Sequence, residues 1–100
     1  MIFDISKITI PKEPGIYLMK DSKGEIIYIG KAKNLKNRVK SYFLKNQNYK
    51  TEKLVSKIAD IEFVLTDNES EAFLLESNMI KRYRPTYNIE LNKFQVLLVW

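Results

Sequence analysis

The sequence predicts an α+β domain in which a small, mainly antiparallel sheet of three strands is flanked by helices. Two runs of alternating apolar residues surround a short polar turn, which is typical of a hairpin. A third run, rich in β-branched and aromatic residues, follows later, and the segments between and after have helical spacing. One hundred residues, 45% of them hydrophobic, are enough for one compact domain.

The hairpin turns at residues 21–24, Asp-Ser-Lys-Gly. With these four residues as the loop, Lys20 is expected opposite Glu25, and Tyr17 opposite Tyr28. Directly opposed Cβ atoms lie about 4.5–5.5 Å apart, so the two phenols would share one surface. An aromatic pair that only stabilises the sheet explains the same pattern. Alternation predicts that one face carries Tyr17, Met19, Ile26 and Tyr28, and the other Ile16, Leu18, Ile27 and Ile29.

Asn34 is expected to cap a helix over residues 35–44. Arg38 lies at the edge of the apolar stripe of this helix, three residues after Leu35 and four before Tyr42. Its guanidinium and the Tyr42 hydroxyl can therefore reach the same place. The apolar stripe consists of Leu35, Val39, Tyr42 and Phe43.

Residues 45–48 read as a polar loop, after which Thr51 is expected to cap a short helix. Its inward side chains would be Leu54, Val55 and Ile58. The third strand is predicted over residues 61–66 and the last helix from about residue 70 to 82 or 83. That helix should end there because Pro85 disfavours a helical conformation at Arg84.

Glu76 lies in the middle of the apolar arc of the last helix. The arc consists of Ala72, Phe73, Leu75, Met79, Ile80 and Tyr83. Burying a carboxylate without a partner costs several kcal/mol, so Glu76 requires a cation. An ion pair with Arg38 or a lysine would provide one. A divalent metal is the other possibility, because Mg²⁺ often binds one protein carboxylate and keeps water and phosphate as its other ligands.

The basic residues are unevenly spread. The net charge of +5 comes from 17 Lys and Arg against 12 Asp and Glu, and residues 31–57 contain eight Lys, one Arg and a single acid, Glu52. Such a segment attracts a polyanion such as nucleic acid. A solvated, lysine-rich surface is the alternative.

The composition excludes several classes of function. With no cysteine and no histidine, the chain has no disulfide, zinc finger, thiol nucleophile or imidazole base. Acid–base work would fall to Tyr, Lys, Asp or Glu. No apolar run is long enough to cross a membrane, and the first residues do not read as a signal peptide, so we expect a cytoplasmic location.

The motifs together resemble the GIY-YIG nuclease family. Gly15, Ile16 and Tyr17 supply the first signature, Tyr28, Ile29 and Gly30 the second. Within the family, the chain is most similar to the N-terminal nuclease domain of the incision subunit of bacterial nucleotide excision repair. The similar blocks are residues 14–19, 28–39, 41–43, 71–76 and 84–89, and the resemblance spans roughly residues 11–91.

The resemblance implies a metal-dependent endonuclease that hydrolyses a DNA phosphodiester during excision repair. Its partners would be damaged double-stranded DNA and the damage-recognition proteins of the UvrA/UvrB system. Glu76 would hold one divalent ion, Mg²⁺ or Mn²⁺, and Arg38 would contact the scissile phosphate. The residues expected around the attacking water are Tyr17, Tyr28, Lys31 and Tyr42, with Asn88 bracing the site.

One of the tyrosines is expected to act as the base. A phenol with a pKa of about 10 is a poor base at neutral pH unless a nearby cation lowers that pKa. Lys31, three residues beyond Tyr28, or a metal-bound hydroxide could supply this perturbation, and Tyr28 is favoured because it is the closest of the three to Lys31 in the sequence. The choice among the three tyrosines stays open.

Two alternatives remain at this stage. The chain could be a free-standing GIY-YIG endonuclease of a mobile-element, restriction or branched-DNA type. It could also be a silent DNA-binding module. Residues 1–91 would form the domain, and the apolar residues 92–100 a tail acting as a fragment end, an extra strand or a self-association surface. The lysines expected to contact DNA are Lys33, Lys36 and Lys40, together with Lys31, Lys45 and Lys50 in a binding module.

Overall fold

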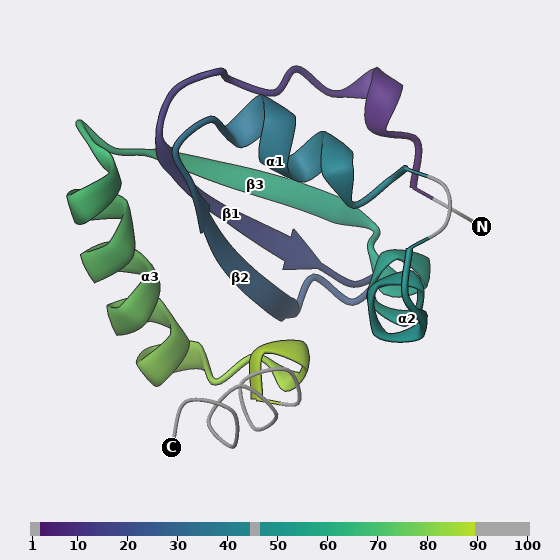
Figure 1. The fold of residues 1–100 in the computed structure, drawn as a ribbon. Helices are drawn as coiled ribbons and strands as arrows, with labels where there is room; N and C mark the ends of the chain where they lie inside the picture. The colour runs from purple at the N-terminus through teal and green to yellow at the C-terminus, as the bar shows by residue number, and fades with distance from the viewer. Residues whose placement is uncertain (1–2, 45–46, 90–100) are drawn as a thin grey trace.

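The computed structural model describes residues 3–44 and 47–89 (Figure 1). Strands β1 and β2 are followed by two helices, then by β3 and the long helix α3, which confirms the α+β class and the order of elements; residues 86–89 form a further helical turn, which was not predicted. A short 3₁₀ helix, η1, precedes them and was not predicted. The bounds are η1 Ile5–Lys7, β1 Gly15–Lys20, β2 Ile26–Ala32, α1 Leu35–Ser41, α2 Tyr49–Lys57, β3 Asp60–Leu65 and α3 Glu69–Tyr83.

The sheet has the order β2-β1-β3, and both pairings are antiparallel. Strand β1 is central, and helices cover both faces of the sheet (Figure 1). One core contains Tyr17 and Met19 with Leu35 and Val39 of α1, and extends to α2. The other contains Ile16, Leu18 and Ile29 with Ala72 of α3. Strand β2 therefore forms an edge of the sheet between α1 and α3.

The predicted hairpin register is wrong by two residues. Tyr17 pairs with Gly30 and Met19 with Tyr28, whereas Lys20 pairs with Ile26, so a bulge interrupts the ladder. The turn accounts for one residue of the shift and the bulge for the other. In the turn, the Asp21 carboxylate accepts the N–H of Glu25 at 3.0 Å and the Asp21 N–H donates to the Glu25 carbonyl at 3.0 Å. Glu25 thus belongs to the turn, in which Gly24 has a φ of 81°.

The bulge changes the faces of two residues. Ile27 packs in the core with Tyr17, and Ile26 packs against the core under α3, the reverse of the prediction. A shift of two residues preserves alternation elsewhere, so Tyr17, Met19 and Tyr28 still share a face, as predicted.

Helices α1 and α2 each begin directly after an asparagine that caps the helix N-terminus. Asn34 caps α1 by accepting the N–H of Asn37 at 3.1 Å, as predicted, although the helix ends at Ser41 rather than residue 44. The predicted cap at Thr51 is wrong: Asn48 accepts the N–H of Thr51 at 2.9 Å, so α2 begins at Tyr49. Leu54 and Ile58 are buried and Val55 packs against them, as predicted.

Helix α3 begins one residue earlier than predicted, after an Asn68 cap. It ends at Tyr83, and Arg84 follows in the left-handed conformation (φ 46°) before Pro85. The predicted apolar arc is only partly buried. Ala72 is buried, but Phe73 and Tyr83 are 54% and 47% exposed. Because α3 packs mainly on β2 and β1, a narrow stripe of the helix meets the sheet.

The predicted tail, residues 92–100, and the domain end at residue 91 lie outside the described residues. None of the helices in residues 3–44 and 47–89 has the length and apolar character needed to cross a membrane.

Candidate active site

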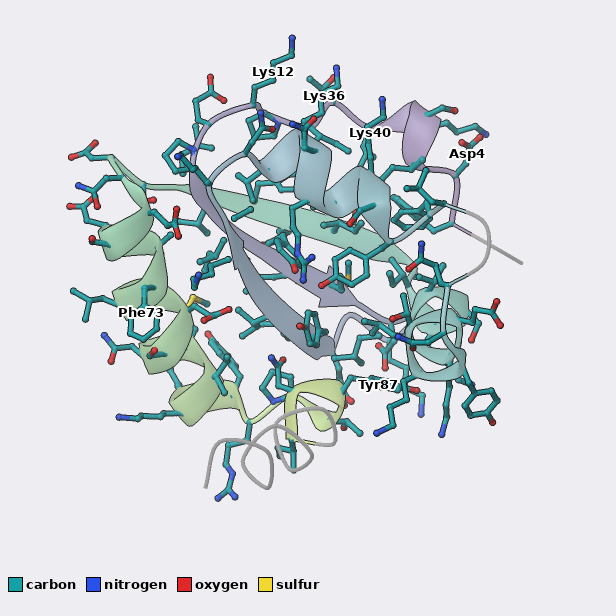
Figure 2. All side chains as sticks on the ribbon, in the orientation of Figure 1. Asp4, Lys12, Lys36, Lys40, Phe73 and Tyr87 are labelled. Carbon is teal, nitrogen blue, oxygen red and sulfur yellow. The ribbon has the colours of Figure 1, made fainter. Side chains whose placement is uncertain are left out.

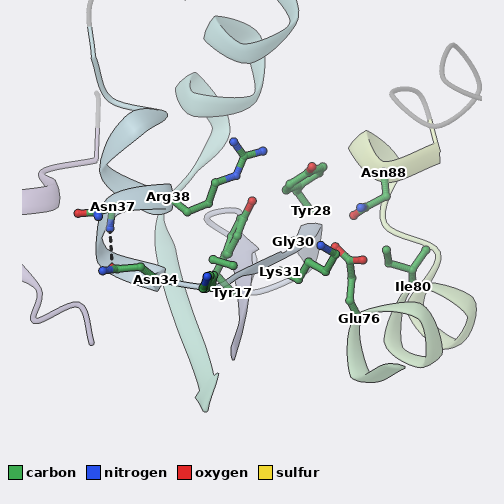
Figure 3. Close-up of a pocket in the computed structure, with 12 residues that line it drawn as sticks. Tyr17, Tyr28, Gly30, Lys31, Asn34, Asn37, Arg38, Glu76, Ile80 and Asn88 are labelled. Atoms are coloured by element: carbon green, nitrogen blue, oxygen red, sulfur yellow. Dashed lines mark hydrogen bonds between the residues drawn. The ribbon is translucent and has the colours of Figure 1, made fainter. Parts of the chain in front are cut away.

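A cleft of about 610 Å³ opens beside β2, between α1 and α3 (Figure 3). Every predicted catalytic or metal-binding residue except Tyr42 lines it, and the ring of Tyr42 packs against that of Tyr17. Among the described residues, three cations and one carboxylate border this space. The lining residues are Tyr17, Tyr28, Gly30, Lys31, Ala32, Lys33, Asn34, Asn37, Arg38, Glu76, Ile80 and Asn88.

Three tyrosines form one cluster on the α1 side of the sheet. The Tyr17 ring centroid lies 6.2 Å from that of Tyr28 and 5.8 Å from that of Tyr42, and the Tyr28 and Tyr42 centroids are 6.2 Å apart. The hydroxyls of Tyr17 and Tyr42 share a hydrogen bond of 2.6 Å. The expected sharing of one surface by the phenols of Tyr17 and Tyr28 is confirmed, in a diagonal rather than a directly opposed arrangement.

Gly30 makes this packing possible. It is the direct partner of Tyr17 across the β1–β2 pair. A Cβ atom at residue 30 would overlap the Cζ and hydroxyl oxygen of Tyr17. The ring of Tyr17, from the first signature, therefore packs directly on Gly30, from the second.

Arg38 reaches the cluster from α1. Its guanidinium donates a hydrogen bond of 3.3 Å to the Tyr42 hydroxyl and lies 5.1 Å from the centre of the Tyr42 ring. This contact confirms that the two side chains reach the same place, as the spacing in the sequence predicts. The hydroxyl of Tyr42 thus links Arg38 to Tyr17.

Burial governs the protonation of the phenols. Loss of solvent raises the pKa of Tyr17 to about 12, and it raises the pKa of Tyr28 and of Tyr42 well above the usual value. The positive charge of Arg38 opposes this rise in each pKa. Arg38 therefore acts on Tyr28 in the direction that the sequence suggested for Lys31, but burial outweighs it, and the pKa of Tyr28 is raised rather than lowered.

Glu76 faces the cleft from α3, half-buried. Burial raises its pKa, while the Lys31 ammonium, the Lys31 backbone N–H and Arg38 act in the opposite direction. Within the part of the chain that the structure describes, no cation lies within ion-pair distance of its carboxylate. Lys31 instead pairs with Glu69, its Nζ lying 3.9 Å from the Glu69 Oε1. The structural ion pair considered for Glu76 is absent among these residues.

Asn88 holds the free edge of β2. Only 3% exposed, it accepts the Ile29 N–H at 2.6 Å and donates to the Ile29 carbonyl at 2.8 Å. Its amide replaces the neighbouring strand that β2 lacks on this side. Because Ile29 lies between Tyr28 and Gly30, Asn88 fixes the strand that carries them.

The predicted DNA-binding lysines separate into two groups. Lys33 lines the cleft. Lys36 and Lys40 project from the outer side of α1, beside Lys12 and away from β2 (Figure 2). Lys50 lies on α2, and Lys45 falls outside the described residues.

Asn37, Ile80 and Glu69 were not singled out as site residues. Asn37 and Ile80 line the cleft, and Glu69 binds Lys31. Spacing held the signal for one of them, because Ile80 is one helical turn beyond Glu76. Glu69 lies two turns before Glu76, but only the packing of α3 on β2 reveals its lysine partner.

The sequence of this cleft matches a known domain. Residues 13–89 match the family described as the UvrC-like GIY-YIG domain. The chain belongs to this family. It is 58% identical over 82 residues to the UvrABC system protein C of Oenococcus oeni and 59% identical over 83 residues to that of Methanococcus maripaludis. Each match covers 82% of this chain but only 14% and 16% of these relatives, so the chain spans about one seventh of their length.

A solved structure supports the assignment. The GIY-YIG N-terminal endonuclease domain of UvrC from Thermotoga maritima superposes with a TM-score of 0.72 at 46% identity, covering 78% of this chain and 85% of that domain. That crystal structure contains its catalytic divalent cation, magnesium. The predicted fold and the assignment to an endonuclease domain of the GIY-YIG family are confirmed.

Proposed function

We propose that this GIY-YIG domain hydrolyses one phosphodiester of a DNA strand with a divalent ion held by Glu76. The observation that carries the proposal is the Glu76 carboxylate: half-buried, in the same cleft as Arg38 and the tyrosine cluster, and without a cation at ion-pair distance among the described residues. A binding module has no use for a carboxylate placed where the DNA phosphate must approach.

The donor set of the cleft fits a hard cation. No group of three or more acidic, histidine or cysteine side chains that could hold a metal occurs in residues 3–44 and 47–89. One carboxylate suits an ion that keeps water and substrate phosphate as its other ligands, as Mg²⁺ does. We propose Mg²⁺ as the ion, with Mn²⁺ as a substitute. When bound, such an ion withdraws electron density from a phosphoryl oxygen and stabilises the charge of the transition state.

Arg38 binds the scissile phosphate in this scheme. Phosphodiester hydrolysis accumulates negative charge on the phosphoryl oxygens, and a guanidinium whose position is fixed before the reaction stabilises that charge. The hydrogen bond from Arg38 to Tyr42, and the bond from Tyr42 to Tyr17, tie the guanidinium to the buried core. Lys31 adds a second positive charge at the rim of the cleft.

The tyrosines orient the attacking water. Burial keeps all three phenols protonated at neutral pH in the free domain, so they act first as hydrogen-bond donors and acceptors. Tyr28 faces the cleft. We propose that it first releases its own proton to solvent, when the positive charge gathered there stabilises its phenolate, and that the phenolate then takes a proton from the attacking water. General-base assistance of this kind contributes roughly 10²–10⁴ in rate.

The substrate we propose is a damaged DNA duplex, incised during nucleotide excision repair. The matched relatives are named as UvrABC system proteins, which favours this setting over a mobile-element or restriction enzyme. Damage-recognition proteins of the UvrA/UvrB type would then present the strand. A cytoplasmic location stays a prediction.

Of the three lysines Lys33, Lys36 and Lys40, we propose Lys33 as the one that contacts the DNA backbone, because it lines the cleft. Removing one lysine–phosphate interaction lowers the slope of log affinity against log salt by about 0.9. Lys33→Ala should lower that slope by about this amount. Lys36→Ala and Lys40→Ala should change it less, because both side chains point away from the cleft. Equal effects at all three positions would show that the duplex also covers the outer side of α1.

Arg38 tests the chemistry directly. Arg38→Ala should leave the domain folded and lower the rate of nicking by about 10²–10³, as removal of one transition-state donor does. Arg38→Lys should restore little, because a lysine cannot reproduce the planar contact with phosphate and Tyr42. Arg82→Ala, on the exposed side of α3, is the matched control. Wild-type nicking by Arg38→Ala would contradict the proposal.

A further inference from the structure

Lys31 stands on the boundary between two hollows. Within residues 3–44 and 47–89, it lines both the active-site cleft and a second, shallower hollow formed with Glu69, Ser70, Phe73 and Leu74 of α3. Its backbone N–H lies on the Glu76 side, whereas its ammonium approaches Glu69 in the second hollow. The side chain therefore borders both hollows.

Two side chains of α3 hold the ammonium in that position. Its Nζ lies 3.9 Å from the Glu69 carboxylate and 6.0 Å from the centre of the Phe73 ring. Glu69, Phe73 and Glu76 occupy one face of the helix at spacings of four and three residues. Phe73 is 54% exposed (Figure 2), so this ring does not belong to the core. A cation–π contact with Lys31 explains why an aromatic side chain lies exposed at this position.

We infer that Glu69 and Phe73 are positioning residues, which hold the Lys31 ammonium away from Glu76 and leave the Glu76 carboxylate free for the divalent ion. The inference rests on the proposed role of Glu76. The charge of Lys31 acts on that carboxylate more strongly than the charge of Arg38 does. An ammonium paired with Glu76 would compete with the metal for the same oxygen atoms.

Substitutions of Glu69 and Phe73 are expected to change the metal affinity of the domain and to leave its folding stability nearly unchanged. Glu69 is about half exposed, so its ion pair with Lys31 adds little to stability. Without Glu69 and Phe73 to hold it, the flexible lysine can turn to Glu76, the carboxylate on its other side. Substitution of a residue that supports a metal ligand typically lowers metal affinity by about 10–100-fold. Glu69 acts through a solvent-accessible amine, so its substitution should lower the affinity by only about 3–10-fold.

The experiment measures Mn²⁺ affinity of the domain by calorimetry, with no DNA present. Glu69→Gln and Phe73→Ala should each weaken binding by about 3–10-fold, and Lys31→Met should strengthen it. Phe73→Ala changes no charge, so its effect cannot arise from long-range electrostatics. The matched controls are Glu52→Gln, which removes an acid from the first turn of α2, and Leu74→Ala, an exposed neighbour of Phe73.

The Lys31→Met background decides the mechanism. If Glu69 and Phe73 act through the lysine, neither substitution should change Mn²⁺ affinity in that background. Unchanged affinity in Glu69→Gln and Phe73→Ala, or the same loss with and without Lys31, would overturn the inference. Equal Mn²⁺ binding by wild type and Glu76→Gln would instead contradict the proposed function, so the two failures are distinguishable.

Discussion

The ring of Tyr17 lies over the α-carbon of Gly30, its direct partner across the β1–β2 pair. This contact joins the two signature motifs in space. It places a phenol at 1% exposure beside Tyr28 and Tyr42, where the Tyr42 hydroxyl meets Arg38. The geometry of the cluster therefore depends on the absence of a side chain at residue 30.

Gly30→Ala should destabilise the domain and displace the Tyr17 hydroxyl. The added methyl group would occupy the position of the Tyr17 ring, and overpacking of this kind costs about 1–3 kcal/mol. Chemical denaturation measures the loss. In a Tyr17→Ala background the same substitution should cost little, because the clashing ring is gone. An equal loss in both backgrounds would show that the ring is not the obstacle.

Tyr42→Phe should lower nicking by about 10- to 100-fold while DNA binding persists. The substitution removes the hydroxyl that accepts from Arg38 and bonds Tyr17, so the guanidinium loses its fixed position. Single-turnover nicking rates, compared with those of Tyr83→Phe at an exposed position of α3, measure the effect. Unchanged single-turnover rates would mean that Arg38 is positioned by other contacts.

Asn88→Ala should loosen β2 at its free edge. Both the N–H and the carbonyl of Ile29 lose their partner, and leaving such buried groups unpaired costs roughly 1–3 kcal/mol. The hydrogen exchange of the Ile29 amide should accelerate by roughly 5- to 150-fold, which is the change in the opening equilibrium that corresponds to this free energy. Asn37→Ala, another asparagine that lines the cleft, is the control. A protected Ile29 amide in Asn88→Ala would show that the side chain does not support the strand.

The tyrosine cluster should make stability fall at alkaline pH. Burial raises the pKa of Tyr17 from 10.0 to about 12, so between these values the folded state binds the proton that the unfolded state releases. The contribution is fully present below pH about 10 and is lost as pH rises toward 12. Two pKa units correspond to roughly 2–3 kcal/mol.

Tyr17→Phe should remove this part of the pH dependence. Denaturation at a series of pH values measures it, and Tyr49→Phe, at an exposed position, controls for the loss of one phenol. If Tyr17→Phe keeps the slope of the wild type above pH 10, the buried phenol is not its source.

Local patterns were sufficient for much of the fold. Most strands and helices were predicted to within a few residues, from the alternation around residues 21–24, the cap at Asn34 and the limit set by Pro85. The exceptions are the early end of α1 and the unpredicted η1. The register was not predictable in the same way. It depends on the Asp21 carboxylate, which draws Glu25 into the turn, and on the bulge that follows in β2. Alternation alone decides neither the loop length nor the position of a bulge.

The site shows the same division. Arg38 and Tyr42 are one helical turn apart, so their contact follows from spacing. The partner of Lys31 could not be derived, because it depends on which stripe of α3 meets β2. Spacing also could not show that Phe73 stays exposed, since a three-stranded sheet covers less of the helix than the apolar arc suggests.

The central claim is that Glu76 holds the metal of a nuclease, and one comparison tests it most directly. Mn²⁺ or Mg²⁺ binding and nicking of a lesion-bearing duplex should be followed in the same samples of wild type and Glu76→Gln. We expect the wild type to bind the ion and nick the duplex, and both properties to vanish together in the variant, whose fold and DNA affinity persist. A wild-type domain that binds DNA but takes up no metal and never nicks would contradict the claim, as would a variant that still cuts.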